Sequence, residues 1–437
     1  MRAFWTNNTK SRLAQLNVPL RLVLPNGERI DSDLRNDRMP QLTVNHWSAL
    51  ADLVKGQLGS IGADLVEGRI YFEGSMRQLM QIAQRLLQTE PNHKTRNVVS
   101  RFMHHSLHQW HSRSRHTRTH DAKQIQSHYD VSDDFYALWL DPMRVYSCAY
   151  FDDATLSLAQ AQEAKLDLIC RKLRLKPGDQ FLDIGAGWGG LLLWAAEHYG
   201  VNATGITLSH NQYAYVQQCI QAKGLQNQVQ IHLMDYRDLS EAHPFDKIAS
   251  IGMFEHVGQA NMDAYFSKIW RLLKPGGLLM NHGITAGGVG YQQLGLGLGD
   301  FIEKYIFPGG ELLHVSEVAK HMGQAQLELL DVENLRPHYA RTLWAWSDNL
   351  ESQLNEARHI LARNNNGRAE QVLQAYRLYL AGCALGFERG WTSLYQMLAM
   401  RTSSASDYPY TRSYMYGQSI AGPGTANSAF TCAAYRF

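Results

Sequence analysis

The sequence predicts an α/β protein with a doubly wound, mostly parallel β-sheet, a helical cap and a small N-terminal α+β domain. Three observations lead to this fold class. From about residue 125, short apolar strands alternate with helical segments. At 181–190, the stretch FLDIGAGWGG takes a strand directly into a glycine cluster and then into a helix. At 273–277, LKPGG ends a helix and begins another strand. Strands separated by helices are typical of parallel sheets.

The first 90 residues are predicted to form the small α+β domain. Residues 20–30 alternate in polarity around an Asn-Gly pair, which is a strong hairpin signal. GRIYFEG at 68–74 predicts another strand. Residues 75–87 then carry apolar side chains at helical spacing, and Ser75 is a candidate N-cap.

A basic, histidine-rich segment follows at 91–124. Between 91 and 120 it contains no acidic residue, six Lys or Arg and seven His. The favoured interpretation is a solvated linker between domains. The alternative is a polybasic contact with anionic lipid head groups that strengthens as the histidines become charged. A metal site is the least favoured interpretation, because the spacing matches no defined ligand set.

The main domain is predicted over 125–400. Its helices are expected at about 157–174, 189–199, 210–223 and 261–273, and its strands at 180–184, 201–207, 228–233, 246–252 and 277–285. Residues 283–299 hold seven glycines, so they are either a lid over an apolar substrate or a plain connection. Residues 316–400 are interpreted as helices whose aromatic side chains form core. The tail at 401–437 is expected to be loosely ordered.

Composition excludes several classes of protein. The 437 residues suffice for two or three domains, and no apolar run is long enough to span a bilayer or to form a signal-peptide core. The five cysteines are scattered and odd in number, so we expect a reducing cytoplasm, no disulfide framework and no metal site. The net charge of +2 gives no reason to expect a nucleic-acid partner.

The glycine cluster predicts a nucleotide-type cofactor. Glycines between a strand and a helix let backbone approach a ligand closely, and the helix N-terminus faces that ligand. Asp183 precedes the turn, and acidic-x-Gly-x-Gly begins many S-adenosylmethionine enzymes. The spacing of Gly185, Gly187 and Gly190 also fits NAD binding. That alternative lacks the acid expected about 20 residues later to hold the ribose.

Several segments, taken in order, go beyond a generic methyltransferase. They are HYDVSDDFYALWLDP (128–142), YSCAYF (146–151), FLDIGAGWGG, GITLSHNQ (205–212), MDYRD (234–238), GMFEHVG (252–258), LKPGG and EKYIFPGG (303–310). Over roughly residues 125–400 the chain closely resembles the cyclopropane-fatty-acid synthase family, which includes the mycolic acid cyclopropane synthases. The N-terminal part looks like the smaller domain of the longer bacterial members.

The resemblance implies a reaction on lipid. The methyl group of S-adenosylmethionine adds to a cis double bond of a phospholipid acyl chain, a carbocation loses a proton, and a cyclopropane closes. The resemblance also implies a bound bicarbonate ion as base, unsaturated membrane phospholipids as partners, a cytoplasmic location at the inner membrane surface, and a homodimer. Relatives that leave a methyl branch, small-molecule methyltransferases and an inactive lipid-binding protein remain the alternatives.

The family motifs assign candidate catalytic residues. They imply that Cys148, Glu255, His282, Tyr305 and the backbone of Ile284 hold the bicarbonate. Glu255 and His282 also follow two successive predicted strands, which places them beside a ligand independently of the family. The alternative is that this pair only fixes a loop. Cys383 matches a recurring C-terminal cysteine and is a candidate, although packing is favoured for it.

The same motifs assign the cofactor site. The glycines admit the methionine and ribose, neutral side chains after the second strand replace the missing ribose acid, and Asp235 accepts from the adenine amino group. For two of these residues, Thr207 and Ser209, helix capping is the alternative. The full set is Tyr146, Ser147, Asp183, Gly185, Gly187, Trp188, Gly189, Thr207, Ser209, Gln212, Asp235 and Tyr236. Ala186 stands where the family motif has Cys.

Overall fold

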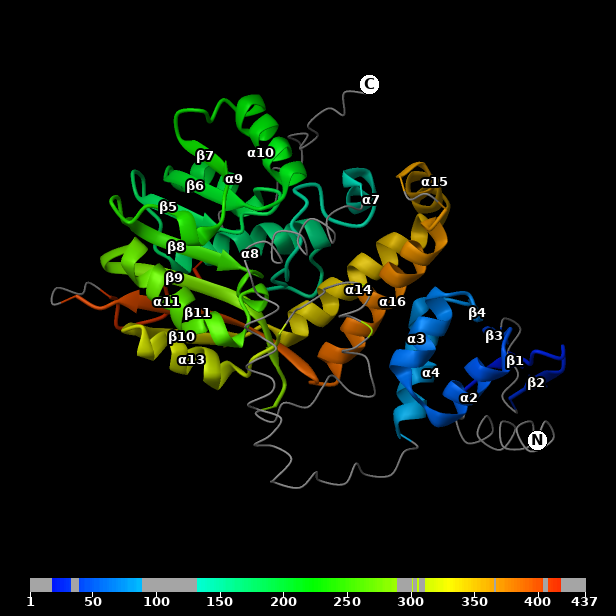
Figure 1. The fold of residues 1–437 in the computed structure, drawn as a ribbon. Coiled ribbons are helices and arrows are strands. Elements are labelled where there is room, and N and C mark those ends of the chain that lie inside the picture. The colour runs from blue at the N-terminus through cyan, green and yellow to red at the C-terminus, as the bar shows by residue number, and fades with distance from the viewer. Residues whose placement is uncertain are drawn as a thin grey trace. The chain divides into compact units, whose positions relative to one another are not determined.

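A seven-stranded β-sheet is the centre of one of two units in the computed structural model (Figure 1). The structure describes residues 18–32, 39–88, 132–288, 301, 305, 311–364, 367–403 and 408–417. The predicted linker at 91–124 and the glycine-rich stretch from 289 to 299 lie outside these residues.

The sheet has the predicted doubly wound, mostly parallel architecture. In spatial order its strands are β10 (Leu327–Asn334), β11 (Thr392–Arg401), β9 (Leu273–Ala286), β8 (Phe245–Ile251), β5 (Gln180–Ile184), β6 (Asn202–Thr207) and β7 (Val229–Leu233). All neighbours from β9 to β7 run parallel, whereas β11 runs antiparallel to β9 and β10. The strand order reverses between β5 and β8, and ligands of such sheets bind where the carboxyl ends meet at that point.

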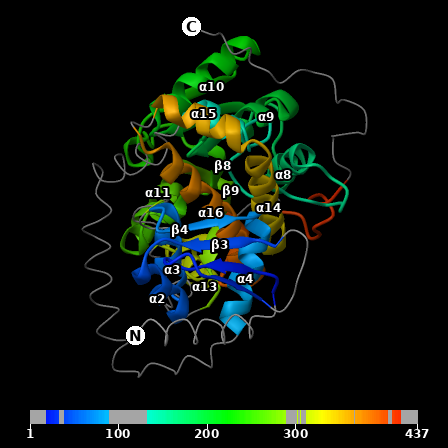
Figure 2. The ribbon, with the colours of Figure 1, turned by 90° about the vertical axis from the view of Figure 1, so that its right-hand side faces the viewer.

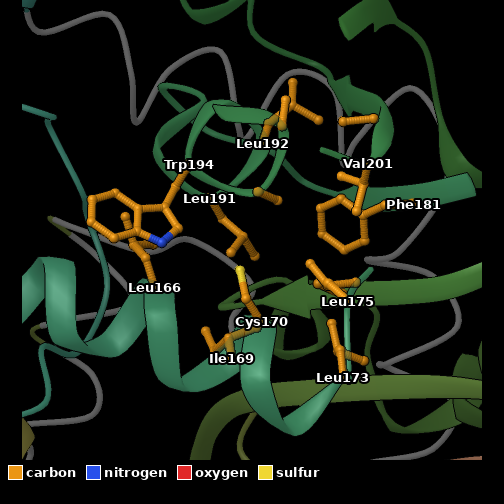
Figure 3. Packing of buried hydrophobic residues seen from close by; sticks show 14 of the residues in the cluster. Leu166, Ile169, Cys170, Leu173, Leu175, Phe181, Leu191, Leu192, Trp194 and Val201 are labelled. Atoms are coloured by element: carbon orange, nitrogen blue, oxygen red, sulfur yellow. The ribbon is translucent and has the colours of Figure 1, made fainter. Parts of the chain in front are cut away.

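Helices cover both faces of this sheet because its strands are apolar on both sides. They are α8 (Leu158–Lys172), α9 (Gly190–Tyr199) and α10 (His210–Ala222) on one face, and α11 (Met262–Leu272) and α13 (Val315–Gln324) on the other (Figure 2). Phe181 of β5 packs on the first face, and its neighbour Leu182 packs on the second. Figure 3 shows Cys170 of α8 and Trp194 of α9 in the core of the first face.

Short elements complete this unit. They are α7 (Asp133–Ala137) and the 3₁₀ turns η1 (Tyr236–Asp238), η2 (Phe254–His256) and η3 (Gln259–Asn261). Local signals explain several boundaries. Ser157 begins α8 with a capping box to Gln160, and Gly200 ends α9 in the left-handed conformation.

The prediction of helices throughout 316–400 is wrong in two stretches. β10 and β11 are strands, and β11 includes Tyr395, which we expected on a helix. β11 is buried on both faces, so its sequence is a nearly continuous apolar run, and such a run cannot be assigned from periodicity alone. The expected loose tail also differs, since Met415 is fully buried in the sheet core and Arg412 forms an ion pair with Asp331.

The two units divide the chain differently from the predicted boundaries. The sheet unit comprises His105–Gly290, Gly309–Thr342 and Gly390–Phe437, and the N-terminal unit comprises Met1–His104, Tyr291–Pro308 and Leu343–Arg389. Contacts explain why Leu343–Arg389 belongs to the same unit as the N-terminal segment. Arg77 makes a bidentate ion pair with Asp348 and lies 4.4 Å over the ring of Trp344. The predicted domain at 125–400 therefore has a helical part that packs with the N-terminal segment.

The N-terminal unit holds a four-stranded sheet and helices. Its elements are β1 (Arg21–Val23), β2 (Arg29–Asp31), β3 (Gln41–Val44), α2 (Trp47–Lys55), α3 (Leu58–Val66), β4 (Ile70–Glu73), α4 (Met76–Gln88), the C-terminal part of α14 (Arg336–Ser352), α15 (Leu354–Asn364) and α16 (Ala369–Glu388). The predicted hairpin is confirmed as β1 and β2, whose turn has Gly27 at φ 83°. The strand at 68–74 and the helix at 75–87 are confirmed as β4 and α4.

Candidate active site

A cavity opens in the sheet unit at the carboxyl ends of β5, β6 and β8, where the strand order reverses. The chain around residues 144–147 and the middle of α8 complete its wall. Ten of the twelve predicted cofactor residues line it. They are Tyr146, Ser147, Asp183, Gly185, Gly187, Trp188, Thr207, Gln212, Asp235 and Tyr236.

The glycine turn forms the part of the cavity next to β5. Gly185 has φ 77° and Gly189, the N-cap of α9, has φ 83°. A Cβ on Gly189 would lie 2.9 Å from the side chain of Val216, so this position requires glycine for two separate reasons. Gly190 and Leu191 begin α9 and line the cavity, which brings the positive end of the helix dipole to the ligand.

The residues at the end of β6 and the start of α10 include a helix cap and two side chains of the cavity wall. Ser209 caps α10 by accepting from the Gln212 N–H, and it does not line the cavity. The Thr207 hydroxyl donates to the Gln212 side-chain oxygen at 2.8 Å, so these two side chains hold each other in the cavity wall. The capping alternative therefore holds for Ser209. Beyond β7, the carboxylate of Asp235 accepts from the backbone and guanidinium of Arg237.

Hydrogen bonds to buried polar side chains fix the segment that carries Tyr146 and Ser147. The buried carboxyl of Asp141 accepts from the Val145 N–H at 2.9 Å, and burial raises its pKa to about 6. The Gln162 amide of α8 donates to the carbonyls of Val145 at 3.2 Å and Ser147 at 2.9 Å. These contacts anchor the segment to α8 and aim Tyr146 and Ser147 at the cavity.

Two buried side chains of opposite charge line the cavity. Burial raises the pKa of Asp183 to about 7, against the opposing influence of Lys165. Burial lowers the pKa of Lys165 to about 8. The Lys165 ammonium donates to the Ser147 hydroxyl at 2.8 Å.

Lys165 is a cavity residue that the family motifs do not indicate. A signal for it is present in the sequence, because Lys165 falls between Ala161 and Ile169 on the buried stripe of α8. Arg144 and Arg237 are other charged residues of the cavity wall that the sequence reasoning missed.

Two of the predicted catalytic residues, Glu255 and Ile284, are in contact near the end of β9, and a third, His282, lies two residues before Ile284 on the same strand. Glu255, in η2, is buried and accepts from the Ile284 N–H at 2.6 Å. Its second carboxylate oxygen is buried and has no partner among the described residues. Burial raises the pKa of Glu255 to about 7. Neither ring nitrogen of His282 has a partner in the described part of the chain, and burial lowers its pKa well below the ordinary value.

The remaining predicted catalytic residues are Cys148, Tyr305 and Cys383. Cys148 is fully buried with its thiol donating to the Ala149 carbonyl, and burial raises its pKa well above the ordinary value. Tyr305 and Cys383 belong to the N-terminal unit, where the Tyr305 hydroxyl donates to Glu67 at 3.0 Å. Burial raises the pKa of Cys383 to about 12, so its thiol is protonated at neutral pH. Catalytic roles for these three stay predictions.

Comparison with known proteins assigns the family. The family model for mycolic acid cyclopropane synthetase matches residues 116–397. The chain belongs to the mycolic acid cyclopropane synthetase family. It is an S-adenosylmethionine-dependent methyltransferase, in agreement with the cavity at the sheet's switch point.

Relatives within this family cover different shares of the chain. A protein of Pseudomonas putida named probable fatty acid methyltransferase is 42% identical over 408 residues, which is 92% of this chain and 98% of that protein. Cyclopropane mycolic acid synthase 1 of Mycobacterium tuberculosis is 38% identical over 287 residues, which is 63% of this chain and 96% of its own length. The family's shorter members therefore correspond to the part of the chain without the N-terminal segment.

Solved structures agree with this assignment. The mycolic acid cyclopropane synthase CmaA1 complexed with SAH and CTAB matches with a TM-score of 0.59 and 36% identity, over 64% of this chain and 98% of that one. Coclaurine N-methyltransferase, at 20% identity and a TM-score of 0.63, covers 78% of this chain and 99% of its own and supports the fold alone. Among the described residues, no helix is long and apolar enough to cross a membrane.

Proposed function

We propose that this methyltransferase converts cis double bonds of phospholipid acyl chains into cyclopropane rings at the cytoplasmic membrane surface. The reaction forms a carbon–carbon bond to the sulfonium methyl group and breaks its bond to sulfur, releasing S-adenosylhomocysteine. The resulting substrate carbocation loses one proton from the new methyl group, and the electron pair of that C–H bond closes the ring.

The main support is a set of buried polar atoms on Glu255 and His282 that have no partner among the described residues. An unactivated alkene needs alignment with the methyl donor and exclusion of water, and the proton must leave to a nearby base. Met253 and His256 flank Glu255 in sequence and line the cofactor cavity. The unpartnered Glu255 oxygen and His282 nitrogens are therefore polar groups next to the donor site that remain available for a ligand. A structural pair that only fixed a loop would bond to protein groups instead.

The same atoms fit a small oxyanion such as bicarbonate. A neutral His282 ring can donate to such an ion, and the second oxygen of Glu255 can accept from the ion's hydroxyl. When bound, bicarbonate would supply a base of suitable strength. Burial raises the pKa of Cys148 and lowers that of His282, and the charge of Lys165 lowers both, so the two groups share a charged neighbour. That common neighbour supports including Cys148 in the proposed bicarbonate site.

Two variants test this proposal. Glu255→Gln and His282→Ala are expected to lower turnover at least about 100-fold, the scale of a lost general-base system. S-adenosylhomocysteine binding, measured by calorimetry, is expected to stay within about threefold, because neither side chain lines the cofactor cavity. Glu328→Gln, at an exposed position of β10, is the matched control. Unchanged turnover in both active-site variants would refute the assignment of Glu255 and His282 to a bicarbonate site.

A second candidate is methylation of the acyl chain without ring closure. The supporting observation is the P. putida relative, which matches 92% of the chain and is named a probable fatty acid methyltransferase. In that case the carbocation is quenched by another route and the new methyl group keeps all its hydrogens. The acyl products distinguish the two outcomes directly.

A further inference from the structure

Lys165 and Asp183 are opposite charges that line one cavity without a direct ion pair in the described structure. Each is almost fully buried, with exposed fractions of 1% and 2%. The Lys165 ammonium uses one of its three donors, on the Ser147 hydroxyl at 2.8 Å. Burying a charge without a full set of partners is costly, so both groups are suited to a charged ligand.

The surroundings of Lys165 leave its charge uncompensated by direct contact. Asp141 stabilises it only from a distance, because that carboxylate accepts from the backbone N–H groups of Met143 and Val145. The other groups that act on Lys165 are Asp183 and the protonated thiols of Cys148 and Cys170. An anion that enters the cavity would therefore be the first direct charged partner of this ammonium.

The cofactor carries two charges that complement this arrangement. Its amino-acid end has a carboxylate and an ammonium on the same carbon, so it presents both signs within a short distance. Asp183 lines the cavity from the end of β5, before the glycine turn, and Lys165 and Ser147 line it from α8 and the 144–147 segment. We propose that Lys165 and Ser147 bind the cofactor carboxylate while Asp183 accepts from the cofactor ammonium.

The proposal assigns a selectivity role to Lys165. A lysine ammonium is a point charge with rotatable donors, which suits a carboxylate that is also held by a hydroxyl. One charge-assisted hydrogen bond in a buried site corresponds to about 10- to 100-fold in affinity. The enzyme is then expected to prefer ligands that keep the carboxylate over otherwise identical ligands that lack it.

The test compares S-adenosylhomocysteine with its decarboxylated analogue, which keeps the ammonium, by calorimetry on the full-length protein. Wild type is expected to bind the analogue about 10- to 100-fold more weakly. In Lys165→Met this difference is expected to shrink to within about threefold, because only the complete ligand loses affinity. Lys247→Met is the matched control, since Lys247 is a second lysine with a pKa lowered to about 8 and lies outside the cavity wall.

Two results would overturn the proposal. One is a wild-type enzyme that binds both ligands equally, a measurement that needs no variant to fold. The other is a Lys165→Met protein that loses the same factor for both ligands, which would make Lys165 a structural residue of the wall. Asp183→Asn supplies an independent check, because it is expected to weaken both ligands while leaving 5′-methylthioadenosine, which lacks the amino-acid end, unaffected.

Discussion

Ionisation of the buried carboxyl of Glu255 is expected to lower the unfolding free energy of the protein. Burial raises its pKa from 4.5 to about 7, against the opposing hydrogen bond from the Ile284 N–H. At about 1.4 kcal/mol per pKa unit, this rise corresponds to about 3 kcal/mol of unfolding free energy. The Glu255→Gln variant keeps an oxygen for the Ile284 N–H and removes the ionisable group.

The sign of the effect follows from proton linkage. Between about pH 4.5 and 7 the folded state holds a proton on Glu255 that the unfolded chain has released, so stability falls as pH rises. Near pH 5 the buried carboxyl is still mostly protonated, so little unfolding free energy is lost. Near pH 8 it is ionised, and the loss is nearly complete. Glu255→Gln is expected to be about 3 kcal/mol more stable than wild type at about pH 8, and within about 1 kcal/mol of it at about pH 5.

Urea unfolding at the two pH values, followed by fluorescence and circular dichroism, measures this difference. Glu328→Gln is the control, because an exposed surface substitution is expected to change stability by less than about 0.5 kcal/mol at either pH. A Glu255→Gln protein that is no more stable than wild type at the higher pH would contradict this expected gain in stability. It would mean that the buried carboxylate ionises without cost.

Three further expectations concern the cavity and the basic segment. Gly189→Ala is expected to lower the unfolding free energy by about 2 kcal/mol and to weaken S-adenosylhomocysteine binding, because the new Cβ meets Val216. Gly224→Ala is the control: its backbone is also left-handed but the space around it is open, so the expected loss is only about 1 kcal/mol. Asp235→Asn is expected to reduce the preference for S-adenosylhomocysteine over S-inosylhomocysteine about 10-fold in calorimetry; an unchanged preference would place the adenine elsewhere. If residues 91–120 contact anionic lipid, vesicle binding is expected to fall steeply above about 0.1 M salt, whereas salt-independent binding would favour a plain linker.

Strong local signals make the sheet and its glycine turn predictable. The strand, turn and helix at 181–190 are β5, the glycine turn and the start of α9. Helices from 157 to 273 begin and end within a few residues of the prediction, because amphipathic periodicity, N-caps and left-handed glycines mark their boundaries. Glu255 follows β8 as the sequence predicts, whereas His282 lies within β9 and not after it. Their position beside a ligand therefore stays a prediction.

Features that depend on tertiary contacts could not be predicted. β11 is an apolar run whose pairing with β9 decides that it is a strand. The spacing of Lys165 from Ala161 and Ile169 is a weak signal for its burial, because a lysine on a helix is usually solvated, and the packing of α8 on the sheet decides it. The ring contact of Arg77 with Trp344 likewise joins side chains that no motif relates.

Mass spectrometry of acyl chains tests the central claim most directly. A host without its own cyclopropane synthase, expressing this chain, is grown with trideuteromethyl methionine and a cis-monounsaturated fatty acid. The account predicts phospholipid acyl chains that gain one labelled carbon carrying two deuterium atoms, with loss of the product in Glu255→Gln. Retention of all three deuterium atoms would contradict ring closure and favour a methyl-branched product, and absence of label from the acyl chains would contradict the proposed lipid substrate.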